Sequence, residues 1–261
     1  RPGMNHTPRK RFGQHFLTAP ETIEMIVAAI DPRPGETIVE IGPGQAAITE
    51  PLASMATELH AIEFDRDLAG ALRTRFATRD NVTIHQADVL DFDFATIGSN
   101  LRVVGNLPYN ISTPLLFHLL EYRALIADMH FMLQKEVVDR ICAKPGNKDY
   151  GRLTIMLGCR LEAVPLFDVP PGAFTPPPRV MSSVVRMRPL PDDRFDIADE
   201  ASLDAVVKLA FSRRRKTLRN ALKGFAEDTD LAAIGLDPSL RPEQVAIPDW
   251  IALANRMALN V

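Results

Sequence analysis

Short apolar runs alternate with amphipathic stretches from about Thr22 to Leu133. Apolar runs bounded by polar residues predict strands, and apolar residues three to four positions apart predict helices. When strands and helices alternate along the chain, βαβ units build a mainly parallel sheet with helices on both faces. The predicted strands are Thr37–Ile41, Glu58–Ile62, Val82–His85, Leu101–Gly105 and Ala127–Leu133, and the predicted helices are Ile23–Ile30, Ala46–Met55, Asp67–Ala77, Pro114–Tyr122 and Lys135–Ala143.

The pattern changes in the second half of the chain. Two more strands, Leu161–Val169 and Ser182–Arg188, flank the proline-rich segment Pro170–Arg179, which the prolines should hold extended and non-helical. The polar, acidic stretch Pro189–Glu200 predicts a linker. We therefore expect an α/β domain with a seven-stranded sheet over residues 1–190 and a small all-helical domain over 191–261. The helices expected there are Leu203–Phe211, Leu218–Phe225, Leu231–Ile234, Pro242–Val245 and Asp249–Leu259.

A glycine turn and two acids follow successive predicted strands. Gly42-Pro43-Gly44 comes directly after the first strand, where glycines let a ligand approach the backbone. Taken by itself, such a turn could also be a plain connection from a strand to a helix. Glu63 ends the next strand, about 20 residues later, which is the spacing of a ribose-binding acid. Asp88 follows the third strand, where a carboxylate can accept a hydrogen bond from an adenine amino group. Together the three features predict a nucleoside site.

The same loop excludes a dinucleotide. It lacks the third glycine of the dinucleotide fingerprint, and the chain has no phosphate-binding Gly-Lys-Ser/Thr loop. A nucleoside without a diphosphate is therefore favoured, and S-adenosylmethionine fits. Glu40, just before the glycines, resembles the acid that methyltransferases place near the methionine ammonium group. Its alternative role is to brace the loop.

Asn106-Leu107-Pro108-Tyr109 follows the fourth strand. The N6 amino group of adenine is a poor nucleophile because its lone pair is delocalised into the ring, so an enzyme must localise and aim it. The Asn106 side-chain oxygen and the Leu107 carbonyl can each accept one N6 hydrogen bond, Pro108 stiffens the loop, and Tyr109 can stack on a flipped base. The alternative is a strand-end turn with a buried tyrosine.

A second aromatic residue lies in Phe174-Thr175-Pro176-Pro177-Pro178. We predict that Phe174 supplies the other face of a base sandwich; the alternative is a lid phenylalanine that packs on the core. Other chemistries find no support. The six histidines form no metal-binding spacing, and no Gly-x-Ser-x-Gly nucleophile elbow occurs.

Composition limits the class of protein. A chain of 261 residues with 46% hydrophobic content is globular, and no apolar run reaches the roughly 18 residues of a membrane span. Two cysteines, Cys142 and Cys159, show neither metal nor redox spacing. With no signal-peptide pattern near the basic N-terminal segment, we expect a cytoplasmic protein.

Net charge is only −3, but the basic residues cluster. One cluster, Arg9-Lys10-Arg11, precedes the aromatic segment Phe12–Leu17, and the other comprises Arg213, Arg214, Arg215, Lys216 and Arg219. Arginine forks suit phosphate contacts, so both clusters predict RNA binding, although such runs are often merely solvated faces. Structured RNA with accessible loop bases is the expected substrate.

In order along nearly the whole chain, these motifs closely resemble the KsgA-type ribosomal RNA adenine dimethyltransferases. The resemblance rests on Gly13-Gln14-His15-Phe16-Leu17, Glu40–Gly44, Glu63, Asp88, Asn106–Tyr109, Phe174–Pro178 and Arg214–Asn220. It implies a Rossmann-like class I methyltransferase fold, with S-adenosylmethionine as cofactor and no metal. The cofactor site that it implies comprises Gln14, His15, Leu17, Glu40, Gly42, Gly44, Glu63, Phe64, Asp88, Val89 and Asn106; His15 stands where relatives often carry asparagine.

The resemblance also implies a substrate. It predicts dimethylation of two adjacent adenosines in the 3′-terminal hairpin loop of 16S rRNA, within an immature small ribosomal subunit, by a monomer. The related Erm-type enzymes, which modify large-subunit rRNA, share the catalytic motifs; the proline-rich loop and the basic run favour the small-subunit branch. A third hypothesis is an assembly factor that acts mainly by binding. A DNA adenine methyltransferase is disfavoured because no large recognition insert is visible.

Overall fold

The computed structural model describes residues 14–55 and 58–259, which form two compact units. The first unit takes in the described residues up to Val138 together with Val164–Pro189, and the second comprises Asp139–Ala163 and the chain from Leu190 onward. Residues 139–163 thus belong to the unit of the C-terminal helices, whereas the sequence-based division groups them with the sheet. Within the described ranges, no helix is both long and apolar enough to cross a membrane.

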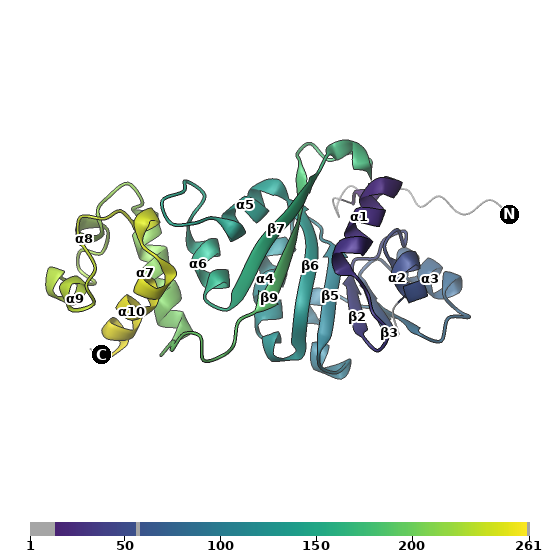
Figure 1. Cartoon of the computed structure of the whole chain (residues 1–261), viewed down its shortest axis with the longest axis horizontal. Helices are drawn as coiled ribbons and strands as arrows, with labels where there is room; N and C mark the ends of the chain where they lie inside the picture. Colours follow the sequence, from purple (N-terminus) through teal and green to yellow (C-terminus); the bar gives the residue numbers. More distant parts are fainter. Residues whose placement is uncertain (1–13, 56–57, 260–261) are drawn as a thin grey trace. The chain divides into compact units, whose positions relative to one another are not determined.

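Strands and helices alternate along the first unit as the hydrophobic pattern predicts (Figure 1). The strands are β1 (Phe16–Leu17), β2 (Thr37–Ile41), β3 (Glu58–Glu63), β4 (Val82–Gln86), β5 (Leu101–Asn106), β6 (Ile126–Gln134), β7 (Leu161–Val169), β8 (Phe174–Thr175) and β9 (Ser182–Pro189). The helices are α1 (Pro20–Ile30), α2 (Thr49–Met55), α3 (Arg66–Arg75), α4 (Ser112–Leu120) and α5 (Lys135–Cys142), with 3-10 turns η2 (Val89–Asp91), η3 (Phe94–Thr96), η4 (Arg123–Leu125) and η5 (Pro171–Ala173).

Seven strands form one sheet in the order β4-β3-β2-β5-β6-β9-β7. The neighbours from β4 to β6 pair in parallel, and β9 pairs with β6 antiparallel. The predicted mainly parallel, seven-stranded α/β fold is confirmed. The chain moves outward from β2 to β4 and then returns to β5 on the other side of β2. Strand order therefore reverses between β2 and β5, the place where open α/β sheets bind ligands.

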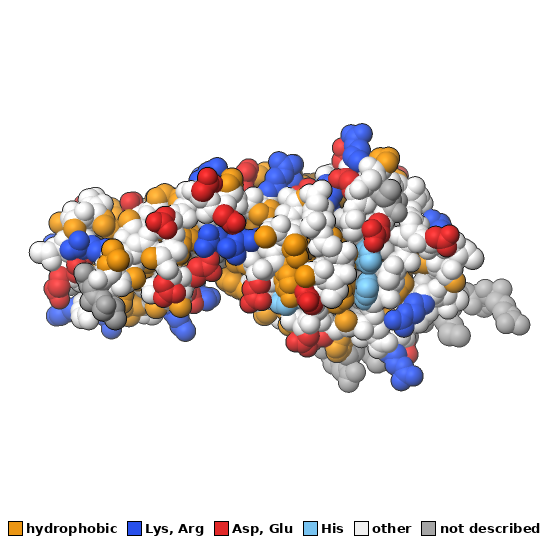
Figure 2. All heavy atoms as spheres, turned by 90° about the horizontal axis from the view of Figure 1, so that it is seen from below, with side chains coloured by type: hydrophobic (Ala, Val, Ile, Leu, Met, Phe, Trp, Pro, Cys, Tyr) orange, Lys and Arg blue, Asp and Glu red, His pale blue; other side chains and the backbone are white. Residues whose placement is uncertain are grey.

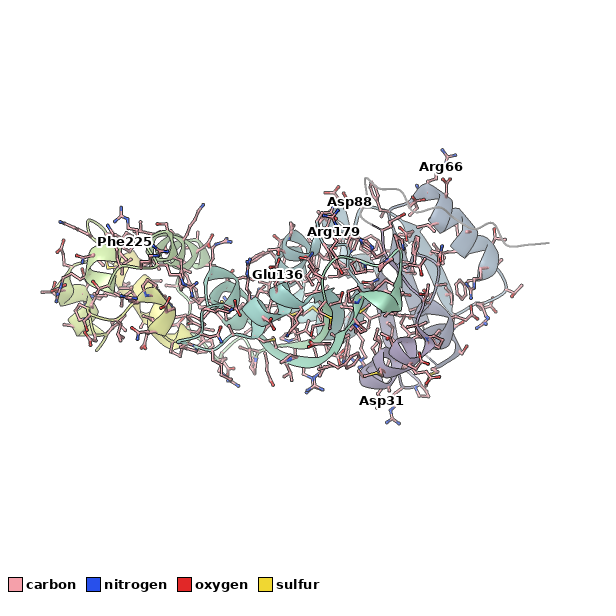
Figure 3. All side chains as sticks on the ribbon, turned by 90° about the horizontal axis from the view of Figure 1, so that it is seen from above. Asp31, Arg66, Asp88, Glu136, Arg179 and Phe225 are labelled. Carbon is pink, nitrogen blue, oxygen red and sulfur yellow. The ribbon has the colours of Figure 1, made fainter. Side chains whose placement is uncertain are left out.

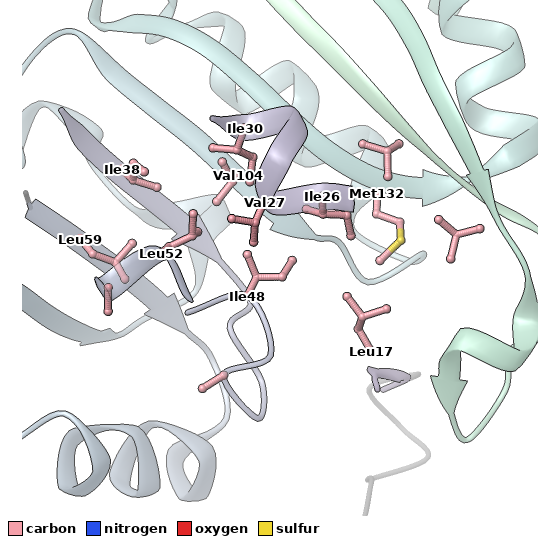
Figure 4. Packing of buried hydrophobic residues seen from close by; sticks show 14 of the residues in the cluster. Leu17, Ile26, Val27, Ile30, Ile38, Ile48, Leu52, Leu59, Val104 and Met132 are labelled. Atoms are coloured by element: carbon pink, nitrogen blue, oxygen red, sulfur yellow. The ribbon is translucent and has the colours of Figure 1, made fainter. Parts of the chain in front are cut away.

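The core of this unit packs α1, α2 and α3 against the sheet (Figure 4). Val27 and Ile30 of α1 and Leu52 of α2 meet Ile38 and Val104 of the central strands, and all five are at most 9% exposed. Burying one such side chain contributes about 1.5–3 kcal/mol. This packing positions the loops after β2 and β5 on a rigid base, with α1 in front of the sheet in Figure 1.

Two details of the proline-rich region differ from the expectation. Pro171–Ala173 form a 3-10 turn, although the segment was predicted to be non-helical. Proline is compatible with the first position of a helical turn, where no hydrogen bond from its nitrogen is needed. Directly afterwards, Phe174 and Thr175 form β8, which pairs antiparallel with β1. This pairing was not predicted, because a two-residue strand has no periodicity and its partner lies far away in sequence.

The second unit is helical apart from the start of β7. Its helices are α6 (Arg152–Gly158), α7 (Glu200–Ser212), α8 (Leu218–Ala221), α9 (Asp228–Ala233) and α10 (Ile247–Ala258), with the 3-10 turn η6 (Pro242–Gln244). Trp250 is fully buried and its ring lies 5.7 Å from that of Phe211, while the Tyr150 hydroxyl donates to the Val245 carbonyl. Helix α6 was not predicted, and α8 ends at Ala221 rather than continuing to Phe225; Gly224 follows with φ +84°.

Gly105 permits the close approach of β5 to β2 where strand order reverses. A Cβ atom at this position would lie 2.4 Å from the carbonyl oxygen of Ile41, its partner in the parallel pairing. We expect Gly105→Ala to lower the free energy of unfolding by about 1–3 kcal/mol or more, because the backbone cannot yield as a side chain would. Urea unfolding measures this loss. Gly70→Ala is the control: on the exposed face of α3, where nothing lies within 4 Å, it should stabilise slightly. Equal midpoints for wild type and Gly105→Ala would contradict the prediction.

Candidate functional site

Two adjoining pockets lie at the loops after β2, β3, β4 and β5, and both are lined by Glu63. They also share Gln14, Gly42 and Pro108. The structure thus brings together the residues that the sequence analysis assigned to the cofactor. The first pocket is lined by Gln14, His15, Leu17, Glu40, Gly42, Gly44, Glu63 and Asn106, and the second adds Phe64, Asp88 and Val89.

Glu63 lies between the two pockets with its carboxylate fixed by backbone donors. Oε1 accepts from the Gly44 amide at 3.1 Å and Oε2 from the Asp65 amide at 3.0 Å, and the residue is 6% exposed. Burial raises the pKa of Glu63 above its usual value, against the lowering effect of those amide hydrogen bonds. Each carboxylate oxygen retains a second lone pair, so a pair of adjacent hydroxyls can still bind there.

Gly42 and Gly44 belong to the turn whose Gly44 amide donates to that carboxylate. Both have positive φ, +66° and +57°, which L-residues with side chains rarely adopt. A Cβ on Gly44 would also lie 3.1 Å from the Phe16 ring. The turn therefore needs glycine for its conformation and for the close contact with Phe16. The predicted nucleoside cradle is compatible with these features and stays a prediction.

At the second pocket, the residues suit an adenine ring. Phe64 is 56% exposed, which is unusual for a large apolar residue, and it brings an aromatic ring to the pocket wall. Asp88 is exposed and its Oδ1 accepts from the Leu90 amide at 3.0 Å, so it caps η2. Capping is thus one role of Asp88. It occupies one oxygen and leaves the other able to accept from an amino group.

Glu40 is almost fully buried at the other end of the first pocket. It is 2% exposed, and the Thr49 hydroxyl donates to its Oε1 at 2.5 Å. Desolvation raises the pKa of Glu40 to about 7, with a smaller contribution from the negative charge of Glu63. A cationic ammonium group beside Glu40 would offset both effects. The pocket therefore fits the methionine end of S-adenosylmethionine. Thr49 itself was not predicted, because no local pattern indicates that its hydroxyl contacts Glu40.

The raised pKa of Glu40 makes stability depend on pH. The folded state holds the proton up to about pH 7 and the unfolded state only to about 4.5, so stability is full below pH 4.5 and falls as pH rises through 7. Glu40→Gln imitates the protonated form and can still accept from Thr49. We expect it to raise the free energy of unfolding of the ligand-free protein by about 3 kcal/mol at pH 8 and by less than about 1 kcal/mol at pH 5. Urea unfolding at both pH values tests this; a pH-independent difference would contradict it.

The loop after β5 lies beside the first pocket. The Asn106 Nδ2 donates to the backbone carbonyl of His15 at 3.3 Å, which orients the side chain and leaves Oδ1 as its acceptor. The Leu107 side chain is buried and its amide donates to the Met132 carbonyl, so this backbone is anchored to β6. Pro108 and Tyr109 line the same pocket. An amino group could thus meet two oriented acceptors.

Tyr109 is held from two sides. Its hydroxyl lies 2.9 Å from the Oγ of Ser182, a buried residue at the start of β9, and its ring stacks with His15 at a centroid distance of 6.0 Å. The His15 Nδ1 donates to the Pro176 carbonyl at 2.7 Å. His15 therefore links the acceptor loop to the proline-rich loop. Ser182 was missed in the sequence because 73 residues separate it from Tyr109.

Phe174 is 4% exposed and belongs to the main hydrophobic cluster, although it also lines the first pocket. This is the burial that the core-packing alternative predicts. A ring so deeply packed presents only part of its surface to the pocket. The predicted second face of a base sandwich therefore stays a prediction, and the buried state of Phe174 weighs against a large stacking area.

The basic run of the second unit does not act as one surface. Arg214 is structural: it pairs with Glu243 at 2.9 Å and donates to the Lys148 carbonyl. Arg219 is exposed but pairs with Asp228, and Arg213, Arg215 and Lys216 are also exposed. On the face shown in Figure 2, positive and negative side chains are interspersed. Phosphate binding by this run stays a prediction, and Arg213, Arg215 and Lys216 are its best candidates because Arg214 and Arg219 already pair with carboxylates. The other predicted cluster, Arg9, Lys10 and Arg11, lies outside the described residues.

The fold resembles solved RNA-modifying enzymes. A dimethyladenosine transferase from Plasmodium falciparum superposes with a TM-score of 0.81 at 23% identity, covering 92% of this chain and 96% of that one. The 23S rRNA methyltransferase ErmE superposes with a TM-score of 0.74 at 24% identity, covering 93% and 99%. At this level of identity, the likeness concerns the fold alone.

Sequence relatives are much closer. A protein of Aromatoleum aromaticum named "Ribosomal RNA small subunit methyltransferase A" is 55% identical over 97% of this chain and 95% of its own length, and one of Dechloromonas aromatica with the same name is 51% identical over 97% and 99%. The family model described as "Ribosomal RNA adenine dimethylase" matches residues 5–259. With a match of this length, and relatives that share half or more of its residues, the chain belongs to the ribosomal RNA adenine dimethylase family.

Proposed function

We propose that this protein transfers methyl groups from S-adenosylmethionine to the N6 atoms of two adjacent adenosines in the 3′-terminal hairpin loop of 16S rRNA. The observation that carries the proposal is that the loop Asn106–Tyr109, which offers two candidate acceptors, lines the first pocket where strand order reverses. Relatives named as small-subunit methyltransferases support the choice of subunit. We further propose that the protein acts as a cytoplasmic monomer on the immature small subunit.

In this mechanism, Asn106 Oδ1 and the Leu107 carbonyl each accept a hydrogen bond from the N6 amino group. These two hydrogen bonds aim the nitrogen lone pair. S-adenosylmethionine supplies an electrophilic methyl group on its sulfonium when bound. The Asn106 Nδ2 contact with His15 fixes which atom of the amide faces the base. Tyr109, held by Ser182, stacks on the base and holds it in place. Once methylated, the nitrogen would carry a positive charge and release one of its protons to water, so no charged base is required there, and the rate gain comes from alignment.

Transfer of labelled methyl groups from S-adenosylmethionine to unmodified ribosomal subunits tests the proposal. Small subunits, large subunits and naked rRNA are offered in parallel, and the modified nucleosides are identified after digestion. We expect dimethyladenosine in small subunits only. Label in large subunits would assign the chain to the Erm-type branch, whose solved member ErmE shares the fold.

The assembly-factor hypothesis predicts a different result. A factor that acts only by binding would support small-subunit maturation with an inactive site. A cell that lacks the wild-type protein and carries Asn106→Ala separates the two roles. Normal maturation without dimethyladenosine would make binding the essential role, and failure of both would tie the cellular role to methyl transfer.

A further inference from the structure

A third pocket lies at the opposite edge of the sheet from the proposed methyl-transfer site. It is lined by the end of α1 and by strands β5, β6 and β9, including Arg102, His130, Arg186 and Arg188. Asp31, at the end of α1, also lines it, and Figure 3 shows Asp31 and Asp88 on opposite sides of the first unit. The pocket therefore shares no residue with the nucleoside site and has no role in the mechanism above.

His130 is the most unusual group in this pocket. It is 3% exposed, and neither ring nitrogen has a hydrogen-bond partner within the described part of the chain. Leaving a buried polar group without a partner is costly, so such groups in folded proteins usually contact a water molecule, an ion or a ligand. Burial, together with nearby arginines, lowers the pKa of His130 to about 4 despite Asp128. At neutral pH the ring is thus uncharged, with one N–H donor and one acceptor nitrogen.

The carboxylates of the pocket are already paired. Arg102 binds Asp128 through two hydrogen bonds of 3.0 Å and pairs with Glu36 at 3.0 Å, and Arg33 pairs with Asp31 at 2.8 Å. Arg102 also donates to the carbonyls of Ile30 and Asp31. Its guanidinium is consequently saturated and acts as a fixed wall.

Arg186 and Arg188 remain as cations that pair with no carboxylate of the described residues. Arg186 is the cross-strand partner of His130 in the β6–β9 pairing, and Arg188 lies two residues further along β9, so all three side chains share one sheet face. Two guanidiniums beside a neutral N–H donor form the donor set that phosphate oxygens prefer.

We propose that this pocket binds a phosphate group, with Arg186 and Arg188 as the charged ligands and His130 as the inner hydrogen-bond donor. The phosphate could be free, as inorganic phosphate or a monoester, or it could belong to the backbone of bound RNA. The site is independent of methyl transfer, and its test needs no turnover.

Inorganic phosphate is the first probe, titrated into the full chain at constant ionic strength with chloride as the counter-anion. Isothermal calorimetry gives the affinity, and long-range proton–nitrogen spectra of the imidazole rings show whether His130 is contacted. We expect saturable binding that shifts one histidine pair of resonances, and at least about tenfold weaker binding in Arg186→Gln/Arg188→Gln. Arg73→Gln, an exposed arginine on α3, removes a positive charge elsewhere and should bind like wild type.

Loss of binding in the double variant alone supports the site. Equal affinity in wild type and double variant, or no saturable binding to either, overturns it. A second arm identifies the source of the phosphate from the salt dependence of affinity for a small-subunit hairpin RNA. A slope lower by about one to two in the double variant assigns the site to an RNA backbone phosphate, and an unchanged slope assigns it to a free phosphate.

Discussion

Asn106→Ala is expected to reduce the kcat of methyl transfer by about 100- to 1,000-fold, the effect of removing one oriented hydrogen-bonding group from a reacting centre. The side chain supplies one of the two proposed acceptors for the N6 amino group. Its other contact, from Nδ2 to the His15 carbonyl, contributes only about 1 kcal/mol to stability. Single-turnover transfer to unmodified small subunits measures the change in rate.

Folding and cofactor binding must be measured on the same variant. We expect a small change in Tm and less than a tenfold change in the Kd of S-adenosylmethionine, because Glu63 and the glycine turn are untouched. Asn147→Ala is the matched control: it also removes one local hydrogen bond, to the Asp149 amide, but lies in the second unit. An Asn106→Ala enzyme with a kcat within threefold of wild type would refute the proposed acceptor role.

Glu63→Gln should weaken the binding of S-adenosylmethionine by about 100-fold. The carboxylate accepts from the amides of Gly44 and Asp65 and, in the proposal, from the two ribose hydroxyls. A glutamine places an NH2 group where one oxygen accepted, so a donor faces a donor. Losing one or two charge-assisted hydrogen bonds, each worth about 1.5–3 kcal/mol, gives a change of this size. Calorimetry with the product S-adenosylhomocysteine measures it without turnover.

Glu58→Gln provides the comparison for Glu63→Gln. Glu58 lies at the opposite end of the same strand and is exposed, so the substitution removes the same charge without touching the pocket. It should bind the cofactor like wild type. Equal affinities for Glu63→Gln and Glu58→Gln would remove Glu63 from the ribose site and leave it as a brace for the glycine turn.

Most elements of the first unit could be predicted from periodicity. The strand Thr37–Ile41 and the acid that ends β3 can be predicted from the local sequence. Parallel strands then bring their carboxyl ends to one edge of the sheet. The positions of Glu63, Asp88 and Asn106 at successive strand ends therefore predict a shared site. Motifs such as Asn106–Tyr109 are contiguous, so the sequence alone determines which groups the loop carries.

Contacts between distant segments were decided by the tertiary structure. Ser182 reaches Tyr109, and Thr49 reaches Glu40, because packing of β9 and α2 brings them close, and no local pattern encodes such partners. Burial likewise decided that Phe174 packs mainly in the core.

The third pocket shows most clearly which features the sequence determines and which depend on the tertiary structure. The sequence determined that Arg186 and Arg188 alternate along one strand and so share a face. Only the antiparallel pairing of β9 with β6 placed Arg186 opposite His130, and only burial left that ring without a partner. Local pattern fixes the chemistry that each segment carries, whereas desolvation and pairing depend on segments far apart in the chain.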